Sequence, residues 1–103
     1  MKPRLGQTLA SPVDTTTVIV VRAPDGEIEL TCAGVEMWDP KGAQEAPGGT
    51  ADPAQLAGSL LGKRYADDQV GIELLCTRPG RGTIAVNGAP LALMGPKKLP
   101  ASD

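Results

Sequence analysis

Two stretches in the first half of the chain carry the residue patterns of β-strands. Residues 15–21 are almost entirely β-branched, and β-branched side chains favour the extended backbone of a strand. Residues 28–32 alternate apolar and polar side chains, which is the period of a strand with one buried face. Because the turn-forming residues 24–26 lie between the two stretches, we predict a first β-hairpin unit over residues 15–39.

The second half of the chain repeats this pattern and predicts a second β unit over residues 62–94. Apolar residues dominate 72–77 and 83–86, and a turn rich in glycine and arginine separates the two stretches. Asn87 and Gly88 follow, a pair that suits a tight hairpin because both residues tolerate positive φ. The whole chain is therefore expected to be an all-β domain built from small hairpins.

Three segments lack a strand pattern and are expected to be irregular. Residues 1–14 are polar and contain two prolines, which predicts a flexible N-terminal arm. Residues 40–61 are rich in Gly, Pro and Ala and are predicted to be a loop or linker. This linker has room for one short helix that begins at Asp52, a residue type that caps helix N-termini. Residues 95–103 are the expected C-terminal tail.

The composition removes several classes of function. The 103 residues contain no histidine and two cysteines, which excludes His-dependent catalysis, His-ligated metals and a four-thiolate site within one chain. A net charge of −2 with one Trp and one Tyr offers little to a nucleic acid. We therefore expect no cofactor, no nucleic-acid partner and no enzymatic activity of the chain by itself.

Targeting features point to the cytoplasm. The first residues carry positive charge but no apolar stretch follows them, and the longest apolar run, residues 18–21, is far shorter than a membrane span. We therefore expect no membrane association. In the reducing cytoplasm Cys32 and Cys76 are expected to be free thiols, with a disulfide between them as the less favoured alternative.

Residues in the second β unit follow the spacing of a small metal-binding domain. In that domain a glycine and a tyrosine precede a Cys-x-x-Cys-Gly turn, and a strand and a glycine-rich turn lead to Gly-Thr-Leu-x-Cys-Cys-Gly. The stretch from Gly62 to Leu91 resembles this domain without a gap. The domain is the rubredoxin-like domain of the desulforedoxin family, which is also found at the start of desulfoferrodoxins. The matching residues are Gly62, Tyr65, Gly71, Gly80, Gly82, Thr83 and Gly88.

The resemblance covers the framework of that family but not its metal ligands. The four positions that would carry thiolates hold Asp67, Val70, Val86 and Asn87. Because soft sulfur ligands hold iron or zinc in this fold, the resemblance implies a degenerate site without metal, in which the two valines fill the space. A hard-cation site from Asp67, Asp68 and Asn87 is the weaker alternative, since it offers too few oxygen ligands without several waters.

A shorter likeness lies within the chain itself. Residues 30–37 align with residues 84–91, and both segments follow the end of the family motif. The alignment suggests two pseudo-repeated halves joined by the flexible loop and packed as desulforedoxin pairs two copies. Cys32 would then be the last ligand of a lost set. The alternative is that the eight residues match without a repeat.

Cys32 is the sharpest single candidate for chemistry. Glu36 and Asp39 are close in sequence, and neighbouring carboxylates raise the pKa of a thiol, which argues against an activated nucleophile. We therefore expect a structural, buried cysteine. A redox-reactive thiol and a metal ligand shared across a dimer interface are the alternatives.

The glycine-rich turn offers a weak anion-binding site. Gly80 and Gly82 allow backbone amides to approach an anion, and Arg78 and Arg81 lie beside them. The sequence therefore predicts a weak phosphate or carboxylate contact at the two arginines. The alternative is a solvated turn whose charge keeps a small β protein in solution.

The strand at residues 15–21 is the main candidate for an interaction surface. Both of its faces are apolar, and a chain this short has difficulty covering both. We therefore expect a homodimer or a larger protein partner. The leading hypothesis is a non-catalytic accessory or small structural subunit that docks on itself or on a larger, enzyme partner; the alternative is a redox or metal-binding protein that uses Cys32 across a dimer interface. The interaction residues are Thr17, Val18, Ile19, Val20 and Val21.

Overall fold

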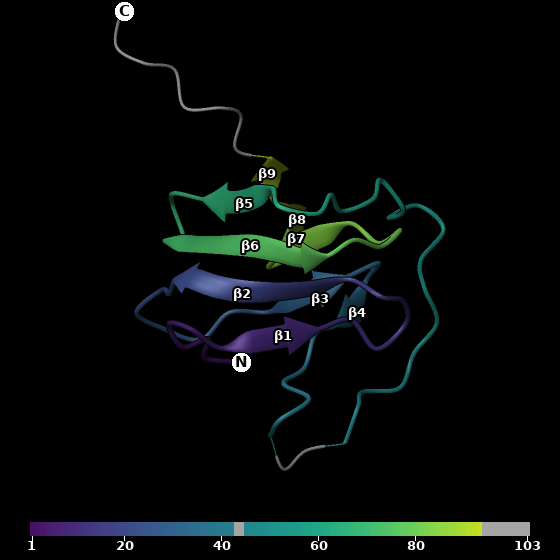
Figure 1. Ribbon diagram of the computed structural model, residues 1–103, viewed down its shortest axis with the longest axis horizontal. Helices are drawn as coiled ribbons and strands as arrows, with labels where there is room; N and C mark the ends of the chain where they lie inside the picture. Colours follow the sequence, from purple (N-terminus) through teal and green to yellow (C-terminus); the bar gives the residue numbers. More distant parts are fainter. Residues whose placement is uncertain (43–44, 94–103) are drawn as a thin grey trace, which may run out of the picture.

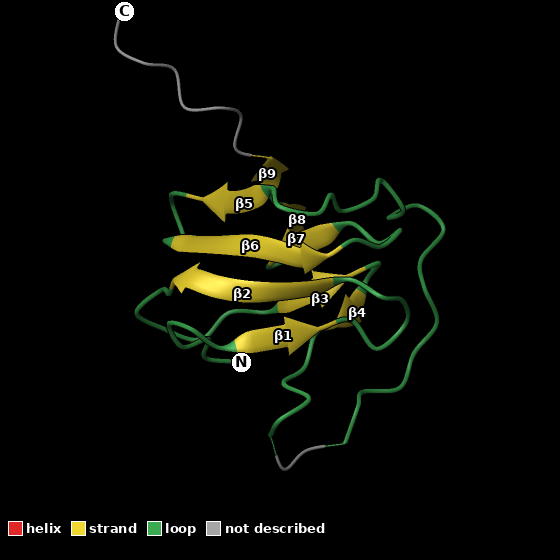
Figure 2. Ribbon diagram, viewed as in Figure 1, coloured by secondary structure: helices red, strands yellow, loops and turns green. Residues whose placement is uncertain are grey.

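The chain is built from short antiparallel strands (Figures 1 and 2). The computed structural model describes residues 1–42 and 45–93, and these residues contain nine strands and no helix. The all-β prediction is confirmed, whereas the predicted tail at 95–103 lies outside the described residues. The strands are β1 (Thr8–Ala10), β2 (Thr17–Arg22), β3 (Leu30–Cys32), β4 (Val35–Glu36), β5 (Arg64–Asp67), β6 (Ile72–Arg78), β7 (Ile84–Val86), β8 (Ala89–Pro90) and β9 (Ala92–Leu93).

The strands form two sheets that enclose one hydrophobic core. One sheet has the order β1-β2-β6-β5-β9 and the other has the order β4-β3-β7-β8. Figure 1 shows β1, β2, β6 and β5 of the first sheet in front of the second sheet. Alternate residues of the long strands β2 and β6 point inward, as the period of a strand requires. The core cluster consists of Leu9, Val18, Val20, Ile28, Leu30, Cys32, Met37, Tyr65, Ile72, Leu74, Cys76, Ile84, Val86 and Leu91.

The predicted hairpin between the first two strand patterns is wrong. β2 pairs with β1 and β6, whereas β3 pairs with β4 and β7 in the other sheet. The segment between β2 and β3 therefore crosses from one sheet to the other instead of reversing within one. The physical reason is that a two-stranded hairpin would leave two open edges, while the sandwich gives both strands a neighbour on each side.

The predicted flexible arm at residues 1–14 is also wrong over much of its length. β1 pairs with β2 from Thr8 to Ala10, and Leu9 is fully buried. The amino group of Met1 donates a hydrogen bond to the Ile28 carbonyl at 2.7 Å. A three-residue strand with one large apolar side chain has no periodic signal, yet burying that side chain and completing the ladder hold the segment in place.

The predicted helix at Asp52 does not form, although part of the linker is tightly attached. The Asp52 carboxylate accepts the N–H of Ala54 at 2.9 Å, which closes a turn in place of a helix cap. Gly58 has a φ of +92°, a left-handed conformation that interrupts any helix at that point. Ser59 is buried and forms an isolated bridge with Gly80.

The two central strand pairs share one symmetry relation. Val20 of β2 pairs with Leu74 of β6, and Thr31 of β3 pairs with Ala85 of β7. Both separations are 54 residues, since 74 − 20 = 54 and 85 − 31 = 54. A two-fold relation that matches residue i with residue i + 54 would map each of these pairs onto itself, although only Val20 and Thr31 lie directly opposite their matches, since Ile19 pairs with Leu75 and Cys32 with Ile84.

The short hairpins at the two ends of the second sheet obey the same relation. Met37 donates its N–H to Leu30 and Leu91 donates its N–H to Ile84, both at 2.9 Å. The intervening turns have positive φ at Ala33 and Gly34 and at Asn87 and Gly88. We keep internal duplication as a hypothesis for the origin of this symmetry.

Candidate functional site

The four positions that the family resemblance would assign to metal ligands hold structural residues. The Asp67 carboxylate accepts the N–H groups of Gln69 at 2.9 Å and Val70 at 3.2 Å. Val86 is buried in the core, and the Asn87 amide oxygen accepts the Glu29 N–H at 2.9 Å. Within residues 1–42 and 45–93 no group of three or more His, Cys, Asp or Glu side chains is placed to hold a metal.

Both cysteines are free thiols inside the core. The Cys32 Sγ lies against Gly82 and is 3.9 Å from the Asp14 carboxylate, while the Cys76 Sγ donates to the Arg78 carbonyl at 3.1 Å. Burial raises the pKa of the Cys32 thiol and of the Cys76 thiol. Neither cysteine has the exposure or the lowered pKa of a reactive nucleophile.

An internal carboxylate occupies the amides of the glycine-rich turn. Asp14 accepts the N–H groups of Arg81 at 3.0 Å and Gly82 at 2.7 Å, and its other oxygen accepts the Thr16 N–H at 2.9 Å. Burial alone would raise the pKa of Asp14, but the hydrogen bonds from Thr16 and Gly82 outweigh it and lower the pKa. The anion at these amides is therefore part of the protein, and the Arg78 and Arg81 side chains lie on its exposed surface.

The predicted interaction strand divides between core and surface. Val18 and Val20 are fully buried, so these two residues cannot contact a partner. Thr17, Ile19 and Val21 are half-buried on the outer face of the first sheet. Because β2 is an inner strand, its backbone is paired on both sides and offers no open edge.

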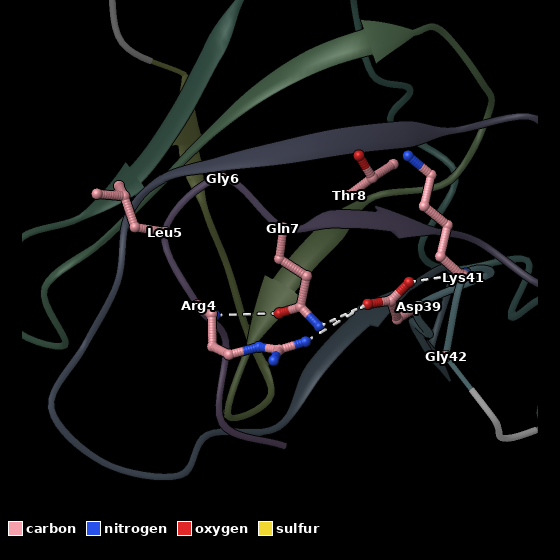
Figure 3. A pocket seen from close by; sticks show the side chains of 8 residues that line it. All are labelled: Arg4, Leu5, Gly6, Gln7, Thr8, Asp39, Lys41 and Gly42. Carbon is pink, nitrogen blue, oxygen red and sulfur yellow. Dashed lines mark hydrogen bonds and ion pairs between the residues drawn. The ribbon is translucent and has the colours of Figure 1, made fainter.

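A polar pocket lies between the N-terminal loop and the turn after Trp38 (Figure 3). Its volume is about 450 Å³. Gln7 Nε2 donates to the Asp39 carboxylate at 2.9 Å, and the Arg4 guanidinium is 3.9 Å from the same oxygen. The Gln7 hydrogen bond, the Lys41 backbone N–H and the Arg4 charge lower the pKa of Asp39. The pocket therefore presents fixed charges, and Asp39 is ionised near neutral pH and cannot act as a general acid there.

An apolar groove lies where the two sheets open at β8 and β9. We call it the leucine groove; its volume is about 300 Å³. The Tyr65 hydroxyl accepts the Leu60 N–H at 2.9 Å and ties one wall to β5. Among the described residues, none of those that line it is charged. The lining residues are Ala57, Gly58, Leu60, Tyr65, Thr83, Ile84, Pro90, Leu91 and Leu93.

Exposed leucines gather around this groove. Five large apolar side chains are exposed in the part of the chain that the structure describes, and two of them, Leu60 at 53% and Leu93 at 48%, line the groove. Leu56 and Leu61 flank the loop residues that form one wall, whereas Leu5 borders the polar pocket. Sequence reasoning missed the groove because its walls come from segments far apart in the chain.

Comparison of the chain with protein-family models, with curated proteins and with solved structures finds no match. In the described ranges no helix has the length and hydrophobicity needed to cross a lipid bilayer. The function is therefore inferred from the surface and the pockets of the molecule itself.

Proposed function

We propose that this protein is a non-catalytic docking subunit, and that the leucine groove is its docking surface. The observation that carries the proposal is the grouping of exposed leucines around a hollow whose described lining residues carry no charge. Clustered apolar surface of this kind is a mark of interaction sites, whereas singly scattered leucines are ordinary. Half-exposed leucines beside a recess also supply the apolar centre that a protein interface needs.

The reactive side chains support binding over catalysis. The Asp14 carboxylate is held by three backbone N–H groups, and the Asp39 carboxylate is held by Gln7 and Lys41. Cys32 is fully buried, so a redox or metal-binding role for it across a dimer interface has no observation in its favour. We propose the cytoplasm as the setting, where buried free thiols are the ordinary state.

The resemblance to the desulforedoxin family suggests how such a docking subunit arose. We propose that a metal-binding scaffold kept its glycine-rich turns and lost its thiolate ligands. Val86 in the core and the tight packing at Gly80 and Gly82 fit a scaffold that is now held together without metal. A protein whose stability no longer depends on metal is suited to a structural role.

Affinity capture from the native lysate tests the docking function. The bait is the tagged full chain, and the comparison is a double variant, Leu60→Lys with Leu93→Lys, that places two charges in the groove. Leu5→Lys is the matched control, because Leu5 is an exposed leucine outside the groove.

We expect the wild type and Leu5→Lys to retain the same protein, a second copy of the chain included, and the groove variant to lose it. Circular dichroism confirms that each variant is folded. Retention of the same proteins by all three baits would contradict the proposed docking surface.

A further inference from the structure

We propose that Asn87 and Gly88 form a deamidation site that the native turn protects, so that the reaction proceeds when the hairpin of β7 and β8 opens. Both residues are exposed to the water and base that the reaction needs, so burial does not protect them. Neither residue lines the leucine groove, and the site is therefore separate from the proposed docking surface.

The chemistry of the site follows from the glycine after the asparagine. The Gly88 nitrogen attacks the side-chain Cγ of Asn87, so that an N–Cγ bond forms, the Cγ–Nδ2 bond breaks, and ammonia leaves with the proton of the Gly88 nitrogen. Water then opens the succinimide ring at one of its two carbonyl carbons. Opening at Cγ gives aspartate, and opening at the main-chain carbonyl gives isoaspartate. Because glycine has no Cβ, no side chain at residue 88 hinders the attack.

The conformation of the turn keeps the two reacting atoms apart. Val86 pairs with Ala89, so Asn87 and Gly88 are a two-residue hairpin loop, and their φ values of +50° and +85° identify a type I′ turn. The first loop residue of such a turn has a ψ of about +30°. The ring closes only when Cβ and the next nitrogen lie on the same side of the Cα–C bond, whereas in an L-residue this ψ places them on nearly opposite sides.

Two hydrogen bonds with Glu29 fix Asn87 in this conformation. The Asn87 N–H donates to the Glu29 carbonyl at 2.7 Å, and the Asn87 side-chain oxygen accepts the Glu29 N–H at 2.9 Å. A hydrogen bond to the amide oxygen makes Cγ more electrophilic, but here it also holds the amide against the segment before β3. Because the Gly88 nitrogen cannot approach Cγ while the turn persists, the hairpin must open before the ring can form.

The short strand β8 makes local opening accessible. It contains Ala89 and Pro90, both exposed, and Pro90 has no N–H to donate to its partner Ala85. Short exposed elements open at a lower free energy than core strands. After the reaction, aspartate can restore the turn, since a carboxylate also accepts the Glu29 N–H. Isoaspartate adds one carbon to the main chain of the loop and cannot restore it.

The variant Asp25→Asn supplies a matched Asn-Gly pair in the same chain. Asp25 and Gly26 are exposed, neither has a positive φ, and a Cβ at Gly26 would meet nothing within 4 Å. The folded variant is incubated at neutral pH, and peptide mass spectrometry follows deamidation at both positions. We expect Asn87 to react at least about ten times more slowly than position 25, because only molecules with an open hairpin react there.

Concentrated urea removes the protection. Positions 25 and 87 of the unfolded variant should react at similar rates, and Asn87 should react at least about ten times faster than in the folded protein. The wild type gives the same comparison at Asn87 without a substitution, and circular dichroism confirms the folded state. Equal rates at the two positions of the folded variant would overturn the proposal, as would a rate at Asn87 that urea leaves unchanged.

The products give a second test. The isoaspartate form, separated from aged wild-type protein by reversed-phase chromatography and refolded, should unfold at a lower urea concentration than Asn87→Asp, which carries the same charge. Equal midpoints would contradict the loss of the turn in the isoaspartate form.

Discussion

At the scale of single residues, two glycines in the turn after β6 are needed because their neighbours leave no room for a side chain, and not because their φ is positive. A Cβ at Gly82 would collide with the Cys32 Sγ and lie 3.1 Å from the backbone nitrogen of Ala33. A Cβ at Gly80 would collide with the Thr16 hydroxyl. The turn is therefore pressed directly against β3 and the start of β2, and any side chain there would separate the two sheets at this end.

Gly82→Ala is expected to lower the free energy of unfolding by about 1–3 kcal/mol, the usual cost of overpacking a closed site. Urea denaturation followed by circular dichroism measures it. Gly26→Ala is the control, because a Cβ there meets nothing within 4 Å, and it should change stability by less than about 1 kcal/mol. Equal stability of the two variants would mean that the turn does not pack as described.

The carboxylate of Asp14 predicts a stability change with a defined pH dependence. In Asp14→Asn the three backbone N–H groups that donate to this side chain no longer face a charged acceptor. We expect the substitution to lower the free energy of unfolding by about 1–3 kcal/mol at neutral pH. The folded pKa is lowered from 3.8. The stabilisation is therefore fully present above pH 3.8 and is lost as the pH falls through the folded pKa.

Urea titrations of the wild type and Asp14→Asn between neutral and acid pH measure this difference. The gap between the two free energies of unfolding should be constant at neutral pH and shrink below pH 3.8. Asp25→Asn, at an exposed turn position, is the control for general charge effects. A gap that widens in acid would contradict the assigned role of Asp14.

At the scale of elements, the hairpin of β7 and β8 depends on one asparagine. Asn87 has a φ of +50° and exchanges two hydrogen bonds with Glu29, one from its backbone at 2.7 Å and one to its side chain at 2.9 Å. The residue thus both forms the turn and attaches it to the segment before β3. The sequence signal for this turn was correct, and the contact with Glu29 was not visible in it.

Asn87→Ala is expected to lower the free energy of unfolding by about 1–2 kcal/mol, because the side-chain acceptor is lost and alanine is strained at positive φ. Asn87→Gly loses the same acceptor but removes the strain, so it should be less destabilising in the same denaturation experiment. If Asn87→Gly were the less stable of the two, positive φ would not be the constraint at this turn.

The strands themselves were predictable where periodicity was strong, and their partners were not. The pattern at 15–21 corresponds to β2 and the pattern at 72–77 to β6. The strand β1 was missed because three residues carry no period. The pairing of β2 with β6 was missed because it joins segments more than fifty residues apart, and local turn residues favour a hairpin between neighbours.

At the scale of the whole molecule, the two halves of the chain contribute to one hydrophobic core. The first half contributes β1 to β4 and the second half β5 to β9, and each sheet contains strands from both. The leucine groove, by contrast, is lined by the second half alone, from the 57–60 loop, β5 and the β7–β9 region, although these segments belong to different sheets. Composition and periodicity could therefore identify the apolar residues but not bring them together.

This mixing of halves predicts a single cooperative unfolding transition. Leu74 is fully buried and pairs with Val20 across the central strand pair, so Leu74→Ala should lower the free energy of unfolding by about 2–5 kcal/mol. Trp38, the one tryptophan, lies in the first half and bridges to Ala10. Its fluorescence transition should shift together with the circular dichroism signal, although the substitution is in the second half.

The control is Leu5→Ala, which changes an exposed leucine and should leave both transitions in place. Coincident transitions in Leu74→Ala would follow from a core that both halves share, because removing one side chain opens a cavity that each half lines. A Trp38 transition that stays at its wild-type midpoint while the circular dichroism transition moves would instead indicate two halves that unfold separately, and the symmetry between them would then have no energetic consequence.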